Sequence, residues 1–220
     1  MNLPIDPRTG MVDLSEKGRD AAGAVISSNR RVFMQLLAYG GCTDLKPVIE
    51  AVRTVKVAAA VYHDFNDPLG IGIVAASEDP DFFTGPWRSL LSRAPFTSLV
   101  QKHDYTMLGR SYSIGYEADL DHVLVHRPIK RLTSPEWPWA VWYPLRRAGA
   151  FEKLPAEEQK AILGEHGKLG AMFSASGFGH DIRLDSRGLD RNDNDFMIGL
   201  IGSELFPLSA MVQAMRKTRQ

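Results

Sequence analysis

A histidine lies near the end of a predicted helix in the second half of the sequence. The stretch 155–170, PAEEQKAILGEHGKLG, starts with Pro155, carries acids in its first turn and ends in glycine, which is typical of a helix. Ile162, His166 and Leu169 share one face of it by the i, i+3, i+4 rule. A histidine on such an apolar face is either a hydrogen-bonded core residue or a metal ligand, because a haem iron needs an imidazole held on an apolar wall.

A tyrosine lies in the strand predicted just before that helix. In PWAVWYPLRR, residues 138–147, alternation places Trp139, Val141 and Tyr143 on one face. The same pattern fits aromatic core packing. It also fits a flat apolar wall with a phenol, suited to a large planar ligand.

Other motifs give little support to other chemistries. The glycines of GIGIVA, residues 70–75, lie inside a predicted strand and not at the strand-to-helix turn that a dinucleotide site requires. DRNDND, residues 190–195, lacks the glycine and glutamate of an EF-hand, since Asp195 and Ile201 hold those places, so it indicates a hairpin turn. There is also no HExxH pair and no GxSxG motif.

The composition is that of an ordinary soluble domain protein. The chain has 220 residues, of which 44% are hydrophobic, and its 26 basic and 26 acidic residues balance. This balance argues against nucleic acid or an anionic membrane surface as the main partner. The single Cys42 excludes an internal disulfide, and we find neither a membrane-spanning apolar run nor a secretory signal. We therefore expect a cytoplasmic protein.

Strand and helix signals alternate in the same order in both halves of the chain. The first half predicts strand, helix, strand, strand, helix, strand at 30–40, 43–55, 56–64, 69–77, 77–93 and 105–117. The second half repeats strand, helix, strand, strand, helix at 138–147, 155–170, 179–186, 195–202 and 203–218, where one more strand would complete the series.

This order predicts an α+β protein made of two ferredoxin-like βαββαβ halves, of the dimeric α/β-barrel type, with antiparallel sheets covered by helices. We expect an N-terminal arm at 1–29, which lies on the body or on a neighbouring subunit. The two halves then span 30–118 and 119–220, and the second carries the histidine and the tyrosine.

Four segments of the second half resemble the chlorite dismutase family, and most closely its coproheme decarboxylase branch. They are WYPLRR, LPAEEQKAILGEHGKLG, RGLD and MRKT, spread over about 143–218. The resemblance implies paired ferredoxin-like halves, a homo-oligomer (commonly a pentamer), and haem or iron coproporphyrin as the bound tetrapyrrole.

The spacing of Tyr143, Pro155 and His166 allows the family pattern to be laid over the chain without a gap. The resemblance then implies that His166 is the proximal iron ligand and that Tyr143 forms the radical that attacks a propionate. It places Arg147 beside that propionate, and it matches Arg216 and Arg131 to arginines that pair with propionates. Arginine suits this role because it binds carboxylates through two charged hydrogen bonds.

The place opposite the iron is less clearly matched. Asp181 or His180 occupies it, depending on where two extra residues are accommodated, with Gly179 a further possibility and Arg183 a weaker one. Chlorite dismutases have an arginine there, so the pattern disfavours chlorite chemistry. The carboxylate that orients the proximal histidine in the family also has no clear match, since its strand is MIGLIG.

The resemblance leads us to expect that peroxide oxidises the iron, and that Tyr143 passes the oxidising equivalent to a propionate, which loses carbon dioxide and becomes a vinyl group. Coproheme would thus be converted to haem b. Two alternatives stay open. One is a chlorite dismutase or haem peroxidase of the same fold, and the other is a non-catalytic member that binds a tetrapyrrole or keeps only the fold and its assembly.

Overall fold

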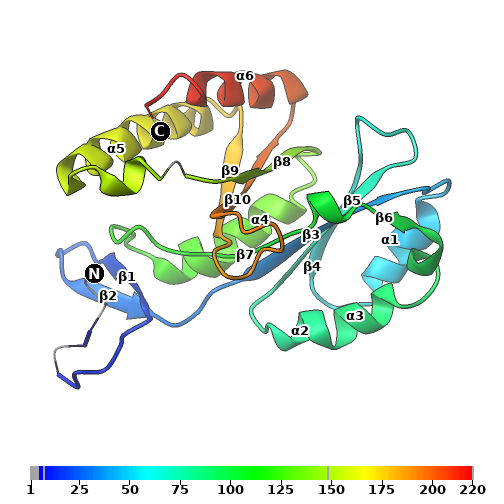
Figure 1. Cartoon of the computed structure of the whole chain (residues 1–220), viewed down its shortest axis with the longest axis horizontal. Helices are drawn as coiled ribbons and strands as arrows, with labels where there is room; N and C mark the ends of the chain where they lie inside the picture. The colour runs from blue at the N-terminus through cyan, green and yellow to red at the C-terminus, as the bar shows by residue number, and fades with distance from the viewer. Residues whose placement is uncertain (1–4, 7, 148, 220) are drawn as a thin grey trace.

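Eight strands form one antiparallel sheet that runs through both halves of the chain (Figure 1). The computed structural model describes residues 5–6, 8–147 and 149–219. The order along the sheet is β4-β5-β3-β7-β9-β10-β8, and β6 also pairs with β3. The mixed α+β, ferredoxin-type fold is therefore confirmed.

The first half supplies the following elements: β3 (Phe33–Gly40), α1 (Lys46–Arg53), β4 (Ala58–His63), β5 (Ile71–Ser77), α2 (Asp81–Thr84), α3 (Pro86–Leu91), β6 (Val100–Gln101) and β7 (Met107–Arg110), with short 3-10 turns at Phe96–Ser98 and His103–Tyr105. The second half supplies a π-helical turn (His122–His126), α4 (Arg127–Thr133), β8 (Trp139–Leu145), a 3-10 turn at Phe151–Lys153, α5 (Ala156–Ala175), β9 (His180–Asp185), β10 (Phe196–Gly202) and α6 (Leu205–Met215).

The two halves have the same strand order. In each, the third strand lies between the first and the second, as β5 lies between β3 and β4, and β10 between β8 and β9. The halves meet where β7 pairs with β9 through Arg110 and Asp185. A strand after α6 is not found among the described residues.

The inner face of the sheet carries a core shared by both halves. Met34 and Val74 from the first half pack in one cluster with Ile182 and Met197 from the second, and Leu132 of α4 joins them. Side chains of the two end strands, β4 and β8, pack against this same cluster, so the sheet is curled. The outer face is covered separately: α1, α2 and α3 lie over the first half, and α5 and α6 over the second (Figure 1).

Several predicted boundaries were wrong. The helix predicted at 77–93 is split into α2 and α3 at Gly85, because Pro86 lacks the N–H that a continuing helix would use. The strand predicted at 105–117 spans only Met107–Arg110. The helical segment 122–133 was not predicted; its Pro128 is the second residue of α4 and directly follows the π-helical turn.

The N-terminal residues form a hairpin of β1 (Glu16–Arg19) and β2 (Val25–Ser28). Glu16 pairs with Arg110 at 3.1 Å and also accepts hydrogen bonds from Ser113. Gly18 passes so close to the chain that an added Cβ would lie 2.2 Å from the Glu117 carbonyl oxygen. The hairpin therefore lies against segment 110–117. No helix in the described ranges is long and apolar enough to cross a membrane.

Candidate functional site

The outer face of the second half carries a row of chemically useful side chains. Ile198 of β10 lies opposite Tyr143 of β8 on one side and Arg183 of β9 on the other. Directly opposite residues in antiparallel strands point to the same face. Tyr143 and Arg183 therefore share the face that α5 and α6 cover, and Asp181 joins them two residues earlier on β9.

Helix α5 covers this face but packs against it weakly. It is 20 residues long, yet Ile162 is its one buried residue. Helix α6 packs more firmly, because Leu208 and Met211 are buried against Leu200 of the sheet. The two helices thus close one end of the face with a tight apolar cluster and cover the rest loosely.

His166 is half-buried on α5 and is oriented from the C-terminal segment. Its Nδ1 lies 3.4 Å from the hydroxyl oxygen of Thr218, at the long end of hydrogen-bond distances. That hydroxyl already donates its hydrogen to the Met215 carbonyl oxygen at 2.7 Å, so toward His166 it can only accept. This arrangement puts the imidazole proton on Nδ1 and leaves the lone pair of Nε2 for a ligand.

The surroundings of His166 also favour a neutral ring. Burial, and then the positive charge of Arg183, lower the pKa of His166 below its ordinary value of 6.5. A neutral imidazole is the form that binds a metal. Among the described residues no three His, Cys, Asp or Glu side chains gather as a metal cage. A metal at His166 would therefore need most of its donors from another source, as in a haem.

Asp181 is the centre of an ion-pair network at the end of β9. Its carboxylate lies 2.7 Å from Arg183 Nε and 3.1 Å from Arg131 Nη1, which also donates to the Asp181 backbone carbonyl. Burial opposes ionisation, but Arg183, Arg131 and Arg127 outweigh it and lower the pKa of Asp181. Arg131, predicted to pair with a propionate, is therefore already engaged with a carboxylate of the chain.

Tyr143 and Arg216 are brought close enough to interact. Burial raises the pKa of Tyr143 above its ordinary value of 10.0, Asp181 adds to the rise, and Arg216 opposes it. Tyr143 thus keeps its phenolic proton at neutral pH. Arg216 follows the last residue of α6, and its side chain is exposed.

Arg147 follows β8, at the end of the face where Leu145 pairs with Phe196. Its guanidinium carbon is 4.7 Å from the centre of the Phe196 ring and 5.1 Å from that of Phe151, which is cation–π geometry. Its backbone N–H donates to Asp195 at 2.7 Å. The position is fixed by these aromatic rings.

The structure does not bring His180 to this face. Alternation along β9 turns His180 away from Asp181 and Arg183, and its ring lies 4.0 Å from the Trp137 ring. Its Nδ1 lies 3.1 Å from Ser174 Oγ. Of these two predicted residues, Asp181 is therefore the one that shares a face with Tyr143.

Four residues that the sequence analysis missed or ranked low belong to this region: Arg127, Arg183, Tyr112 and Thr218. The alternation of charged and apolar residues in HDIRLD could have shown that Asp181 and Arg183 share a face. The spacing of Arg127 and Arg131 is one helical turn. No sequence pattern indicates Thr218, because its contact with His166 depends on how the end of the chain returns to α5.

A small cavity lies between α4 and β9, lined by Tyr112, Arg127, Asp181 and Arg183 among others, with a volume of about 20 Å³. It has room for about one water molecule and not for a tetrapyrrole. A tetrapyrrole would have to lie under α5, where the packing is loose. The donor set fits such a ligand: one neutral histidine above the face, and arginines around it for carboxylates.

Comparison with known proteins agrees with these features. The family model described as chlorite dismutase matches residues 88–220, which is more than half of the chain. A search of curated proteins gave no match. TA0507, a protein provisionally assigned to the chlorite dismutases, superposes with a TM-score of 0.66 at 14% identity, covering 86% of this chain and 87% of that one. The chlorite dismutase from Candidatus Nitrospira defluvii in complex with imidazole gives 0.63 at 14% identity, covering 87% and 85%. At such identities the superpositions show a shared fold, and together with the family model they establish that this chain belongs to the chlorite dismutase family.

Proposed function

We propose that the protein binds an iron tetrapyrrole between α5 and strands β8 to β10, with His166 as the axial ligand. The observation that carries the proposal is helix α5 itself, which spans the face, buries one side chain and presents a half-buried imidazole. The Nδ1 contact with Thr218 leaves Nε2 as the ligating atom. The related enzyme from Candidatus Nitrospira defluvii has been crystallised with imidazole, which is a good ligand for iron.

We infer that the favoured ligand is iron coproporphyrin, because it carries four carboxylates where haem b carries two. Arg216 is exposed just after α6, and Arg147, just after β8, is held by aromatic rings. Arg183 of β9 and Arg131 of α4 both contact Asp181, and their combined charge exceeds that of its carboxylate. An excess of guanidinium groups around an apolar face favours a polycarboxylate over a neutral ligand.

The reaction that we infer is oxidative decarboxylation by peroxide. Each propionate reacts with one hydrogen peroxide and one proton, and yields a vinyl group, carbon dioxide and two waters. The bound tetrapyrrole supplies the two-electron chemistry with peroxide. Tyr143 supports the reaction as a neutral phenol, since its raised pKa keeps on its oxygen the hydrogen atom that it gives up and recovers in each turnover.

Arg183 favours a second candidate, the conversion of chlorite to chloride and oxygen, which needs no other reactant. Its side chain lies on the face that α5 covers, and its charge reaches His166. A guanidinium there would hold an oxyanion next to a metal. The sequence pattern disfavoured this chemistry because it placed no arginine at that position.

We also propose that the protein is a homo-oligomer, with a pentamer favoured by the family resemblance. Large apolar side chains on the outside of the second half support this, since Phe206 is 80% exposed and Met172 66% exposed. Sedimentation velocity at micromolar concentration would measure the assembly, and a sedimenting monomer would contradict the proposal.

The first experiment is a titration with ferric coproheme and with haem b, followed by absorption spectroscopy. We expect a saturable Soret shift that is lost in His166→Ala and kept in His122→Ala, a matched change at an exposed histidine. If neither tetrapyrrole produces a shift, the tetrapyrrole proposal is wrong. If the shift persists in His166→Ala, another residue is the ligand.

The reaction is then tested on the loaded protein. Peroxide should release carbon dioxide, and mass spectrometry should show each propionate becoming a vinyl group, while Tyr143→Phe should stop the reaction and leave the Soret shift intact. Chlorite should be tested in parallel by oxygen evolution. Oxygen release that disappears in Arg183→Met, without decarboxylation, would favour the second candidate. Binding without either reaction would indicate a tetrapyrrole carrier.

A further inference from the structure

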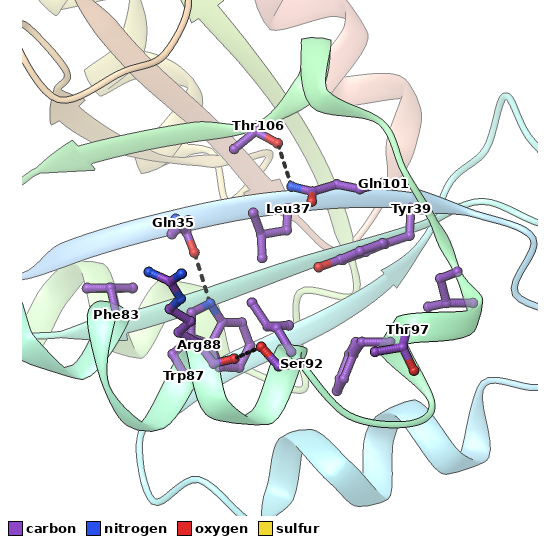
Figure 2. Close-up of a pocket in the computed structure, with 13 residues that line it drawn as sticks. Gln35, Leu37, Tyr39, Phe83, Trp87, Arg88, Ser92, Thr97, Gln101 and Thr106 are labelled. Carbon is purple, nitrogen blue, oxygen red and sulfur yellow. Dashed lines mark hydrogen bonds between the residues drawn. The ribbon is translucent and has the colours of Figure 1, made fainter.

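The outer face of the first half contains a cavity that the proposed tetrapyrrole site does not use. It lies between β3 and α3, and its volume is about 440 Å³ (Figure 2). Ligand pockets for small molecules fall in the range of about 300–1,000 Å³. The cavity is therefore large enough for a small organic ligand.

Tyr39 presents a polar group to this cavity. The residue is 5% exposed, and its hydroxyl points into the cavity (Figure 2). No side chain or backbone group in the described part of the chain hydrogen-bonds to that hydroxyl. Burial raises the pKa of Tyr39 to about 12, so the phenol keeps its proton and acts as a donor. The hydroxyl can therefore donate to a ligand that enters the cavity.

Gln35 supplies a second donor from the same strand. The indole N–H of Trp87 donates to Gln35 Oε1 at 2.9 Å (Figure 2). Since an indole can only donate, the amide oxygen must face Trp87 and the amide nitrogen is left to donate elsewhere. We find no acceptor for that nitrogen in the described ranges. Both groups on β3 can thus donate a hydrogen bond into the cavity.

Arg88 supplies the charge. It is the one ionised side chain of the cavity lining, and it extends from α3 toward the strand that carries Gln35 (Figure 2). Within the described residues its guanidinium has no ion-pair partner. The rest of the lining is mixed, with apolar side chains such as Leu37 and Phe96 beside polar ones such as Thr97 and Gln101.

We propose that this cavity is a binding site for a small aromatic monocarboxylate. Arg88 binds the carboxylate, and the Tyr39 hydroxyl and the Gln35 amide donate to its oxygens or to a neighbouring acceptor. The ring lies against the apolar part of the lining, at Leu37 and Phe96. One guanidinium matches one negative charge, and its fork binds both oxygens of a carboxylate. The site is separate from the proposed tetrapyrrole site and does not depend on it.

Isothermal titration calorimetry with 2-naphthoate tests the proposal, and 2-naphthalenemethanol is the neutral control of the same shape. We expect saturable binding of 2-naphthoate at or below millimolar concentration. The neutral analogue should bind at least about tenfold more weakly, because it lacks the charged hydrogen bonds. Absence of saturable 2-naphthoate binding overturns the proposal.

Three variants locate the binding. Arg88→Met should weaken 2-naphthoate by at least about tenfold, and Tyr39→Phe by severalfold. Arg93→Met removes a nearby exposed arginine that does not line the cavity, so it should leave the affinity unchanged. Circular dichroism checks that each variant is folded. If Arg88→Met binds as tightly as the wild type, the ligand is elsewhere and the proposal is wrong.

Repeating the titration on protein first saturated with ferric coproheme shows which half of the chain binds the probe. The 2-naphthoate affinity should not change. Loss of binding in the loaded protein would mean that the probe occupies the second half, and it would also overturn the proposal. Failure of coproheme to bind leaves the calorimetric result on the first half intact.

Discussion

The outer faces of the two halves have the same strand order but are filled in different ways. In the first half, the short helices and the turn that follows them bury Phe82, Trp87 and Phe96 against the sheet. In the second half, the 20-residue helix α5 buries only Ile162. A ferredoxin-like layout therefore provides two similar surfaces, and the side chains on the covering helices decide how much apolar surface each helix buries.

The two faces also differ in charge. Arg88 is the single ionised residue of the first-half cavity lining. The second half gathers Arg127, Arg131 and Arg183 around Asp181. The first face thus suits a ligand with one negative charge, and the second suits one with several. Substitutions in each half test these differences in packing and charge.

The largest expected effect concerns packing in the first half. Trp87 is 1% exposed, so Trp87→Ala should lower the free energy of unfolding by about 3–5 kcal/mol. On α5, Leu163 is 38% exposed, and Leu163→Ala should change the free energy of unfolding by no more than about 0.5 kcal/mol. Urea denaturation of the two variants measures both values. Equal losses would show that α5 is packed as tightly as α3.

A smaller effect is expected from the contact that orients His166. Thr218→Val removes the oxygen that accepts from Nδ1 and should weaken tetrapyrrole binding by about tenfold. Thr218→Ser keeps the hydroxyl and should bind like the wild type. The Soret titration measures both. If Thr218→Val binds the tetrapyrrole as well as Thr218→Ser does, the histidine is oriented by some other group. As a control, 2-naphthoate binding in the first half should be the same in both variants.

The fold could be predicted from the sequence because both halves repeat the same alternation of strand and helix signals. Individual boundaries could not. Gly85 and Pro86 split one predicted helix, since the position of a proline within a helix decides whether it is tolerated, and the helical segment around Pro128 was missed. The joining of the two halves through β7 and β9 rests on a single residue pair, which leaves no periodic signal.

The candidate site was predictable only where residues follow one another closely in the sequence. Tyr143 and His166 lie in adjacent elements, and their family pattern has regular spacing. Thr218 reaches His166 across 52 residues, and no local pattern encodes that contact. The family pattern could not decide between His180 and Asp181, whereas alternation along β9 places their side chains on opposite faces of the sheet. Contacts between distant segments are set by tertiary packing, which a single sequence does not display.

Glycines give a third test of the contrast between the faces. Gly164 lies inside α5, and a Cβ added there would meet nothing within 4 Å. Gly164→Ala should therefore raise the free energy of unfolding by about 0.4–1 kcal/mol through helix propensity and a less flexible unfolded chain. In the first half, a Cβ on Gly85 would lie 3.1 Å from the Asp81 carbonyl oxygen, so Gly85→Ala should not stabilise the protein. Thermal denaturation compares them, and a destabilised Gly164→Ala would show that α5 contacts another surface.

The smallest expected effect compares the two buried phenols. Burial raises the pKa of Tyr39 to about 12, while the pKa of Tyr143 is raised by burial and held back by Arg216. Each raised pKa stabilises the folded state below pH 10, the ordinary value, and that contribution is lost as the pH rises above it.

Arg216→Met should therefore raise the pKa of Tyr143 further and leave that of Tyr39 unchanged. Alkaline titration of phenolate absorbance measures this, with Tyr143→Phe and Tyr39→Phe as the references that isolate each signal. A pKa of Tyr143 that does not move would mean that the charge of Arg216 does not reach the phenol. Arg216 would then be too far from the face to bind a carboxylate beside Tyr143, and the proposed carboxylate clamp would rest on Arg147, Arg131 and Arg183 alone.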